Sequence, residues 1–259
     1  MNYQKFFFMK YRLLLFFSSF FLISFSQVNM IDDKGLKQGE WAKLYDGTRV
    51  YKYRGTFKDD KPIGKFYYYY KSSKLKAVIN HKENSSRSEA YYYHENGTLM
   101  SYGIFKNQLK DSIWINYTPS QRISSSETYL NGKLNGKKII YYIPDNIDDK
   151  SQIPSVIYTY KHNLLEGKIT EYFRDLSIKL VGTYKNNKKE GVWTSFQANG
   201  KKSSLVRYKN GRRHGWCLGY DVNGNEVSRK YYYLGELIKG KRLEELMDYM
   251  KSKGINPNH

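Results

Sequence analysis

The sequence repeats with a period of about 24 residues, and periods in this range indicate stacked copies of one small structural unit. The clearest copy runs from Gly191 to Tyr208, and Gly215 opens the next. A small residue, which we call the anchor, opens each of eight copies: Gly39, Gly64, Ser88, Ser112, Gly136, Gly167, Gly191 and Gly215. Because such units bury their apolar faces only against neighbouring copies, the period predicts one elongated array.

Aromatic residues recur at fixed distances from the anchor. The column five residues after it reads Leu44, Tyr69, Tyr93, Tyr117, Tyr141, Tyr172, Phe196 and Tyr220, although only 17% of the chain is aromatic. The column two residues after it is mostly apolar: Trp41, Phe66, Ala90, Trp114, Lys138, Ile169, Trp193 and Cys217. A third column, 17 residues after the anchor, holds His81, Phe105, Tyr129, Tyr184, Tyr208 and Tyr232. Stacked copies would turn these columns into ladders of rings.

Each copy contains two short β-prone runs separated by turn residues. Asn199-Gly200 lies between the two runs of one copy, and Asn210-Gly211 leads into the next copy. Asn-Gly tolerates positive φ at both central turn positions, so each copy is predicted to be a β-hairpin. The fold class is therefore all-β: an elongated, single-sheet antiparallel meander of about eight hairpins.

The sequence indicates less directly what the anchor does and on which face of the sheet each column lies. We expect the anchor glycine to allow close backbone approach or an unusual dihedral where hairpins meet. Positions two and five residues after the anchor have opposite parity, so a regular strand points them to opposite faces. Either both faces carry aromatic stacks or a bulge restores the parity, and both alternatives remain open here.

The chain divides into three parts. Residues 1–26 are predicted to be a signal peptide, residues 27–240 the repeat array, and residues 241–259 a capping helix and tail. One step between anchors exceeds the period by seven residues, which indicates an insertion near 144–154. Leu243, Leu246, Met247 and Met250 recur at helical spacing, and we expect their helix to cover the last sheet edge.

The first 26 residues indicate export. Lys10 and Arg12 precede a short apolar stretch, and cleavage is expected after Ser26, with the periplasm, outer envelope or exterior as destination. Translation from Met9 would give a more compact signal. The alternative is an uncleaved anchor over residues 6–25, which would bury both basic residues in the span.

Catalytic and metal-binding signatures are not found. The five histidines lack metal-site spacing, and His94 and His214 fall in predicted turns, where exposed polar residues are expected. Cys217 is the only cysteine, so an intrachain disulfide and a cysteine-based zinc site are excluded. We predict that the protein is not an enzyme and has no cofactor or metal.

Tyrosine runs at residues 67–70 and 91–93 lie among lysines, and half of each run should face outward. We take as the candidate binding surface Tyr68, Tyr70, Tyr92, Lys65 and Lys71. The formal charge is +20, or +17 without residues 1–26, which attracts anionic partners. We expect a non-catalytic scaffold that binds a protein partner at the cell envelope. Attachment to anionic lipid, glycan or cell-wall polymer is the alternative, and export disfavours nucleic acid.

The repeat resembles the MORN family, especially its divergent bacterial form. Gly191 to Gly215 matches best, and the resemblance covers about residues 36–240. Ser88 and Ser112 replace the anchor glycine, and Lys138 replaces an aromatic residue, so those copies depart from the pattern. The resemblance implies a single-layer antiparallel sheet with a groove, and functions in scaffolding or at phospholipid membranes. Bacterial members are often labelled antitoxins, which adds neutralisation of a toxin as a further alternative.

Overall fold

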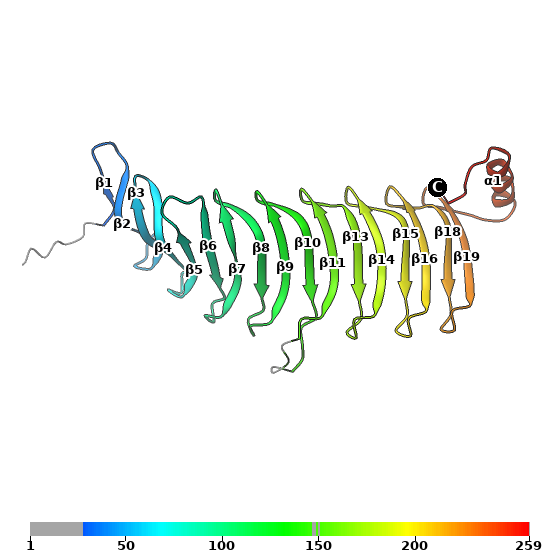
Figure 1. Ribbon diagram of the computed structural model, residues 1–259, viewed down its shortest axis with the longest axis horizontal. Coiled ribbons are helices and arrows are strands. Elements are labelled where there is room, and N and C mark those ends of the chain that lie inside the picture. The colour runs from blue at the N-terminus through cyan, green and yellow to red at the C-terminus, as the bar shows by residue number, and fades with distance from the viewer. Residues whose placement is uncertain (1–27, 147–148, 150, 259) are drawn as a thin grey trace, which may run out of the picture.

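The computed structural model describes residues 28–146, 149 and 151–258. Within these residues the chain forms one elongated antiparallel sheet of 20 strands and one C-terminal helix (Figure 1). The predicted all-β meander is confirmed. The predicted signal peptide lies outside the described residues. No helix in the described part of the chain has the length and apolar character needed to cross a membrane.

Neighbouring strands along the chain are neighbours in the sheet, so the hairpins follow one another without crossing. The strands are β1 (Met30–Ile31), β2 (Lys37–Leu44), β3 (Tyr51–Lys58), β4 (Lys61–Tyr69), β5 (Leu75–His81), β6 (Arg87–Tyr93), β7 (Leu99–Lys106), β8 (Leu109–Tyr117), β9 (Ile123–Leu130), β10 (Lys133–Tyr141), β11 (Pro154–Lys161), β12 (Leu164–Leu165), β13 (Gly167–Tyr172), β14 (Ile178–Lys185), β15 (Lys188–Phe196), β16 (Lys202–Lys209), β17 (Arg212–Arg213), β18 (Gly215–Tyr220), β19 (Glu226–Tyr233) and β20 (Glu236–Ile238). The helix α1 spans Lys241–Ser252. The insertion is the long loop between β10 and β11.

The anchors are sites of backbone irregularity. Gly64 has a φ of 65°, and the register of β4 against β3 shifts around it, from Arg54 opposite Tyr67 to Thr56 opposite Ile63. Such a bulge favours glycine because positive φ is costly for residues with a Cβ. Ser112 adopts the same conformation, with a φ of 61°.

The third copy departs from this rule. Ser88 does not have positive φ, and β5 and β6 pair without a register shift. The Ser88 hydroxyl lies 2.9 Å from Nδ1 of His81, which stands where other copies have Tyr or Phe. In this copy, unlike the copy with Ser112, replacement of the anchor glycine therefore accompanies a regular ladder and a local side-chain hydrogen bond.

One side of the sheet, which we call the packed face, carries the large rings two residues after the anchors. Phe66, Trp114 and Trp193 are almost completely buried there. The Trp193 ring centroid lies 5.1 Å from that of Tyr184 and 5.9 Å from that of Tyr208, so the ring joins two neighbouring hairpins. Edge-to-face pairs of this kind contribute about 0.5–1.5 kcal/mol each beyond burial.

A lysine two residues before the anchor covers each tryptophan of this column. The ammonium groups of Lys110 and Lys189 each lie 4.2 Å from the centroids of Trp114 and Trp193. Lys37 lies 4.9 Å from the centroid of Trp41 in the first copy. The negative ring face attracts the cation, so part of the positive charge of this protein caps its aromatic core.

Glycines on the preceding strand make room for the large rings. A Cβ added at Gly55, Gly103 or Gly182 would lie 2.5, 2.2 or 2.3 Å from the ring of Phe66, Trp114 or Trp193, respectively. Where the column holds Ala90 instead, the residue opposite it is Ile79. The packed face therefore keeps its density by pairing a large residue with a small one.

The fifth copy replaces the ring with an ion pair. Lys138 donates to Glu127 at 2.8 Å, and the Tyr129 hydroxyl donates to the same carboxylate at 2.8 Å. Burial by itself raises the pKa of Glu127, but hydrogen bonds from Lys138 and Tyr129 outweigh it and leave this pKa below its ordinary value. The lysine that departs from the sequence pattern is thus accommodated by a matching carboxylate.

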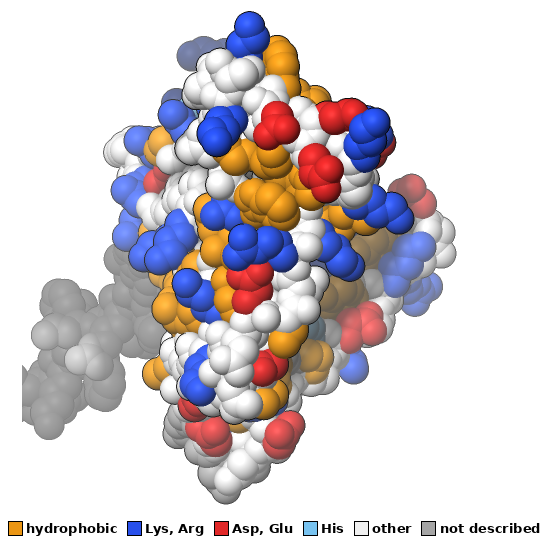
Figure 2. All heavy atoms as spheres, turned by 90° about the vertical axis from the view of Figure 1, so that its right-hand side faces the viewer, with side chains coloured by type: hydrophobic (Ala, Val, Ile, Leu, Met, Phe, Trp, Pro, Cys, Tyr) orange, Lys and Arg blue, Asp and Glu red, His pale blue; other side chains and the backbone are white. Residues whose placement is uncertain are grey.

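The helix α1 closes the C-terminal end of the array. Leu243, Leu246, Met247 and Met250 pack on Trp216, Tyr231 and Ile238. The short strand β20 pairs with the outer edge of β19, and α1 packs on Ile238 of β20, so the predicted cap at the C-terminal end is confirmed. The apolar side of the helix also covers Trp216 and Tyr231, which are large rings on the sheet surface. Figure 2 looks onto this end, where charged side chains surround hydrophobic ones.

We predict that Gly182→Ala destabilises the protein. Alanine normally stabilises a strand relative to glycine, but here its Cβ would meet the Trp193 ring, and such overpacking costs about 1–3 kcal/mol. Urea unfolding measures the change. Gly219→Ala is the control, because its Cβ would approach Ser228 only to 3.3 Å. The loss of unfolding free energy caused by Gly182→Ala should be smaller when Trp193→Leu is also present. If the losses from the two substitutions simply add, the size-matching explanation is contradicted.

Candidate binding face

The side of the sheet opposite the packed face, which we call the open face, carries a continuous row of uncharged side chains. Its members are direct cross-strand neighbours from β4 to β18: Tyr67, Val78, Tyr91, Tyr102, Ile115, Ser126, Ile139, Ile157, Thr170, Val181, Thr194, Leu205 and Leu218. We call this the central row. Arg54 and Arg229 continue it at its two ends. Since each member is paired in register, the row forms one straight uncharged band across the sheet.

Aromatic and basic side chains border the central row. On one side lies the column five residues after the anchor; Tyr141, for example, has its hydroxyl 3.3 Å from that of Ser126 in the row. On the other side lie the exposed Lys65, Lys137 and Lys168. Both faces therefore carry aromatic residues, which answers the parity question. A bulge does occur, because the pairing register with the next strand shifts between the fourth and fifth residues after each anchor, but it does not move the fifth-residue column to the packed face.

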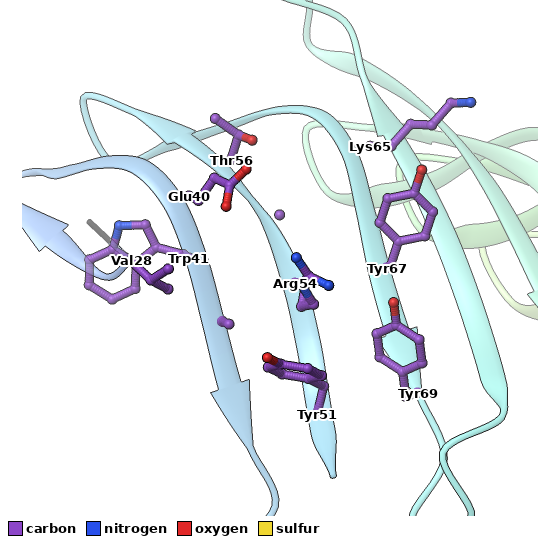
Figure 3. Close-up of a pocket in the computed structure, with 11 residues that line it drawn as sticks. Val28, Glu40, Trp41, Tyr51, Arg54, Thr56, Lys65, Tyr67 and Tyr69 are labelled. Atoms are coloured by element: carbon purple, nitrogen blue, oxygen red, sulfur yellow. The ribbon is translucent and has the colours of Figure 1, made fainter. Parts of the chain in front are cut away.

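A cleft of about 400 Å³ lies on the open face at the N-terminal end. Tyr51 and Arg54 on β3, Tyr67 and Tyr69 on β4, and Glu40 on β2 line it, and Lys65 lies at its border (Figure 3). The Arg54 guanidinium lies 5.1 Å from the Tyr51 ring centroid. Rings beside cations suit ligands that combine flat apolar surfaces with negative charge.

The five residues predicted as the binding surface are not brought together. Tyr68 and Tyr92 lie on the packed face against Phe66 and Trp114, and burial raises the pKa of both hydroxyls. Lys65 lies on the open face, in the cleft. The other two lie at the turn ends: Tyr70 donates to the Tyr93 carbonyl, and Lys71 lies 6.0 Å from the Tyr45 ring. Alternation along β4 instead places Tyr67 and Tyr69 beside Lys65.

Sequence reasoning missed a column six residues after the anchor. Five of its eight side chains bond to a backbone carbonyl of the next copy: Tyr45 to Tyr69, Tyr70 to Tyr93, His94 to Tyr117, Tyr142 to Tyr172 and Gln197 to Asp221. These bonds, which we call latches, tie neighbouring hairpins at their turn ends. The constant spacing from the anchor was the signal, but the changing residue type concealed it.

The structure also shows the surroundings of His94 and His214. His94 is a latch, and His214 is 3% exposed, so the expectation that both are exposed was wrong. The His214 ring accepts a hydrogen bond from the Leu234 backbone NH at 3.3 Å and packs against Tyr233, which explains its burial. Across the described residues, no group of three or more His, Cys, Asp or Glu side chains is arranged to hold a metal ion.

Comparisons with protein-family models and with curated proteins found no match. The resemblance to MORN repeats therefore stays a prediction.

We predict that Tyr70→Phe lowers stability by about 0.5–1.5 kcal/mol, because it removes one latch hydrogen bond while keeping the ring. Chemical unfolding of the purified protein measures this. Tyr249→Phe provides the control, since the Tyr249 side chain is 56% exposed on α1. Equal effects of the two substitutions would argue that the latch contributes nothing.

Proposed function

We propose that the protein is an exported, non-catalytic binding module that engages a protein partner at the cell envelope through its open face. The observation that carries this proposal is the central row: a band of thirteen uncharged side chains in cross-strand register. Ten of the thirteen are aromatic or aliphatic residues, and exposed patches of such residues are a recognised mark of interaction sites.

The contrast between the packed face and the open face supports the proposal that the partner binds the open face. On the packed face, rings fill the space over glycines, lysines cover them, and the Trp114 and Trp193 indole NH groups donate to backbone carbonyls. Those side chains are already used by the fold. On the open face, α1 packs at β18 and β19, whereas the row from β4 to β16 has no second layer over it in the described chain.

Site-specific photo-crosslinking tests the proposal. A photoreactive amino acid at Ile139 on the open face should crosslink to a defined protein in the envelope fraction of the source cells. The same group at Val206, which pairs with Trp193 on the packed face, is the matched control. Crosslinks from Val206 alone, or from neither position in a folded protein, would contradict the proposal.

A second candidate, attachment to an anionic polymer or lipid surface, is favoured by the cleft around Arg54 and Lys65. We predict that Arg54→Gln with Lys65→Gln weakens sedimentation with phosphatidylglycerol vesicles or teichoic acid. Binding of the unaltered protein should also fall steeply with rising salt, because exposed charges are screened beyond about 10 Å at 0.1 M ionic strength. Salt-insensitive binding, or no change in the double variant, would count against this candidate.

A further inference from the structure

We propose that the partner presents an amphipathic α-helix with an acidic polar side, and that this helix lies on the open face over the central row. The inference rests on the proposed function and adds the chemistry of the partner.

The protein already places one amphipathic helix on this face. In α1, Leu243, Leu246, Met247 and Met250 form one apolar stripe, and the stripe packs on Trp216 and Tyr231. These two rings are cross-strand partners on β18 and β19, and both belong to the open face. The Tyr231 side chain becomes completely buried under the helix. The open face is thus compatible with an apolar helical stripe laid directly on its side chains.

The surface on which α1 packs continues toward the preceding hairpin. Val192 and Arg207 pair on β15 and β16 in the positions that Trp216 and Tyr231 occupy one copy later. A cleft of about 490 Å³ lies between them and the tail residues Asn256 and Asn258. Val192 is 47% exposed in it. The surface that holds α1 therefore continues into the uncovered part of the open face.

Charge selects an acidic partner. In the band that borders the central row on the side of the anchors, Lys65, Lys137 and Lys168 are exposed, and Arg207 adds a fourth positive charge. Two acidic residues lie in the same band: Glu89, which is paired with Lys82 at 3.4 Å, and the exposed Glu40 in the N-terminal cleft, so four basic side chains stand against two acidic ones. Opposite charges favour association and like charges oppose it. A second copy of this chain would bring the same basic band against itself, so the field disfavours face-to-face self-association.

Geometry favours a helix over an added strand. Strand addition requires a free sheet edge, and β1 and β20 already pair with parts of the outer strands β2 and β19. The central row instead presents side chains spaced by about 4.8 Å from strand to strand. A helix of about 20 residues is about 30 Å long and would cover about six strands.

Binding of designed peptides to the full chain tests the inference. The probe is a labelled helical peptide of about 20 residues with leucines on one side and glutamates on the other. A lysine version and a scrambled glutamate version are the controls. By fluorescence anisotropy the acidic amphipathic peptide should bind at least about tenfold more tightly than either control. Equal binding of the acidic and scrambled peptides, or preference for the lysine version, would overturn the inference.

Substitutions on the open face test where the acidic peptide binds. Ile115→Gln with Ile139→Gln, and separately Lys137→Glu with Lys168→Glu, should each weaken peptide binding by about tenfold or more. Leu164→Gln is the control, because Leu164 is 40% exposed but lies in a turn strand outside the row. Unchanged binding in both double variants would place the peptide elsewhere and overturn the inference.

The variant with the photoreactive amino acid at Ile139 distinguishes a failure of the helix inference from a failure of the proposed function. If the acidic amphipathic peptide displaces the protein crosslinked at Ile139, both stand. If crosslinking at Ile139 persists in excess peptide, the proposed function stands and the helix inference fails. If the band at Ile139 is a second copy of this chain, confirmed by a dimer in sedimentation, or if anionic vesicles alone abolish it, the helix inference is likewise overturned.

Discussion

Contact between a large ring and a glycine on the neighbouring strand is the interaction on which the array depends. Phe66, Trp114 and Trp193 each lie across a strand that offers no side chain beneath the ring, so the ring reaches the backbone of the preceding hairpin. A single hairpin is marginal in water and gains stability from such neighbours. This contact in three of the eight copies, together with the latches at the turn ends, supports a one-layer sheet of 20 strands in the described residues.

The same contact explains how degenerate copies are tolerated. Two exceptions to the ring column come with a compensation on the facing strand: Ile79 is opposite Ala90, and Glu127 accepts from Lys138. Buried polar groups are costly unless they are hydrogen-bonded, and Tyr129 supplies a further donor to that carboxylate. The array therefore conserves local volume and hydrogen bonding while residue identity varies.

Asymmetry between the faces follows from the packing. Rings, glycines and lysines on the packed face are engaged with one another, although a cleft of about 640 Å³ beside Phe66, Tyr68 and Ile79 also lies on this face. The open face holds the central row and the aromatic column five residues after the anchor, because strand alternation places the residues three and five after the anchor there. Only at its C-terminal end does α1 cover it. Binding through the uncovered part is the use that this distribution of side chains favours.

Several features could be predicted from the sequence because they depend on local spacing. The period, the Asn-Gly turns, the anchor glycines and the terminal helix with Leu243 and Met250 all follow from short-range pattern. The candidate surface could not be predicted so well, since Tyr67, Tyr68 and Tyr70 look alike in sequence and differ only in the face or edge where they lie.

By itself, then, the sequence determined an all-β meander, its copy number and the position of its insertion, because hydrophobic period and turn chemistry act over a few residues. Only the tertiary structure decided which rings meet glycines, which carbonyls the latches reach and where α1 packs. It also decided that thirteen separate residues align into one uncharged row. Those outcomes depend on cross-strand register and on the bulges at the anchors. Neighbouring members of the central row lie 11 or more positions apart in the sequence, so they leave no pattern within a single strand.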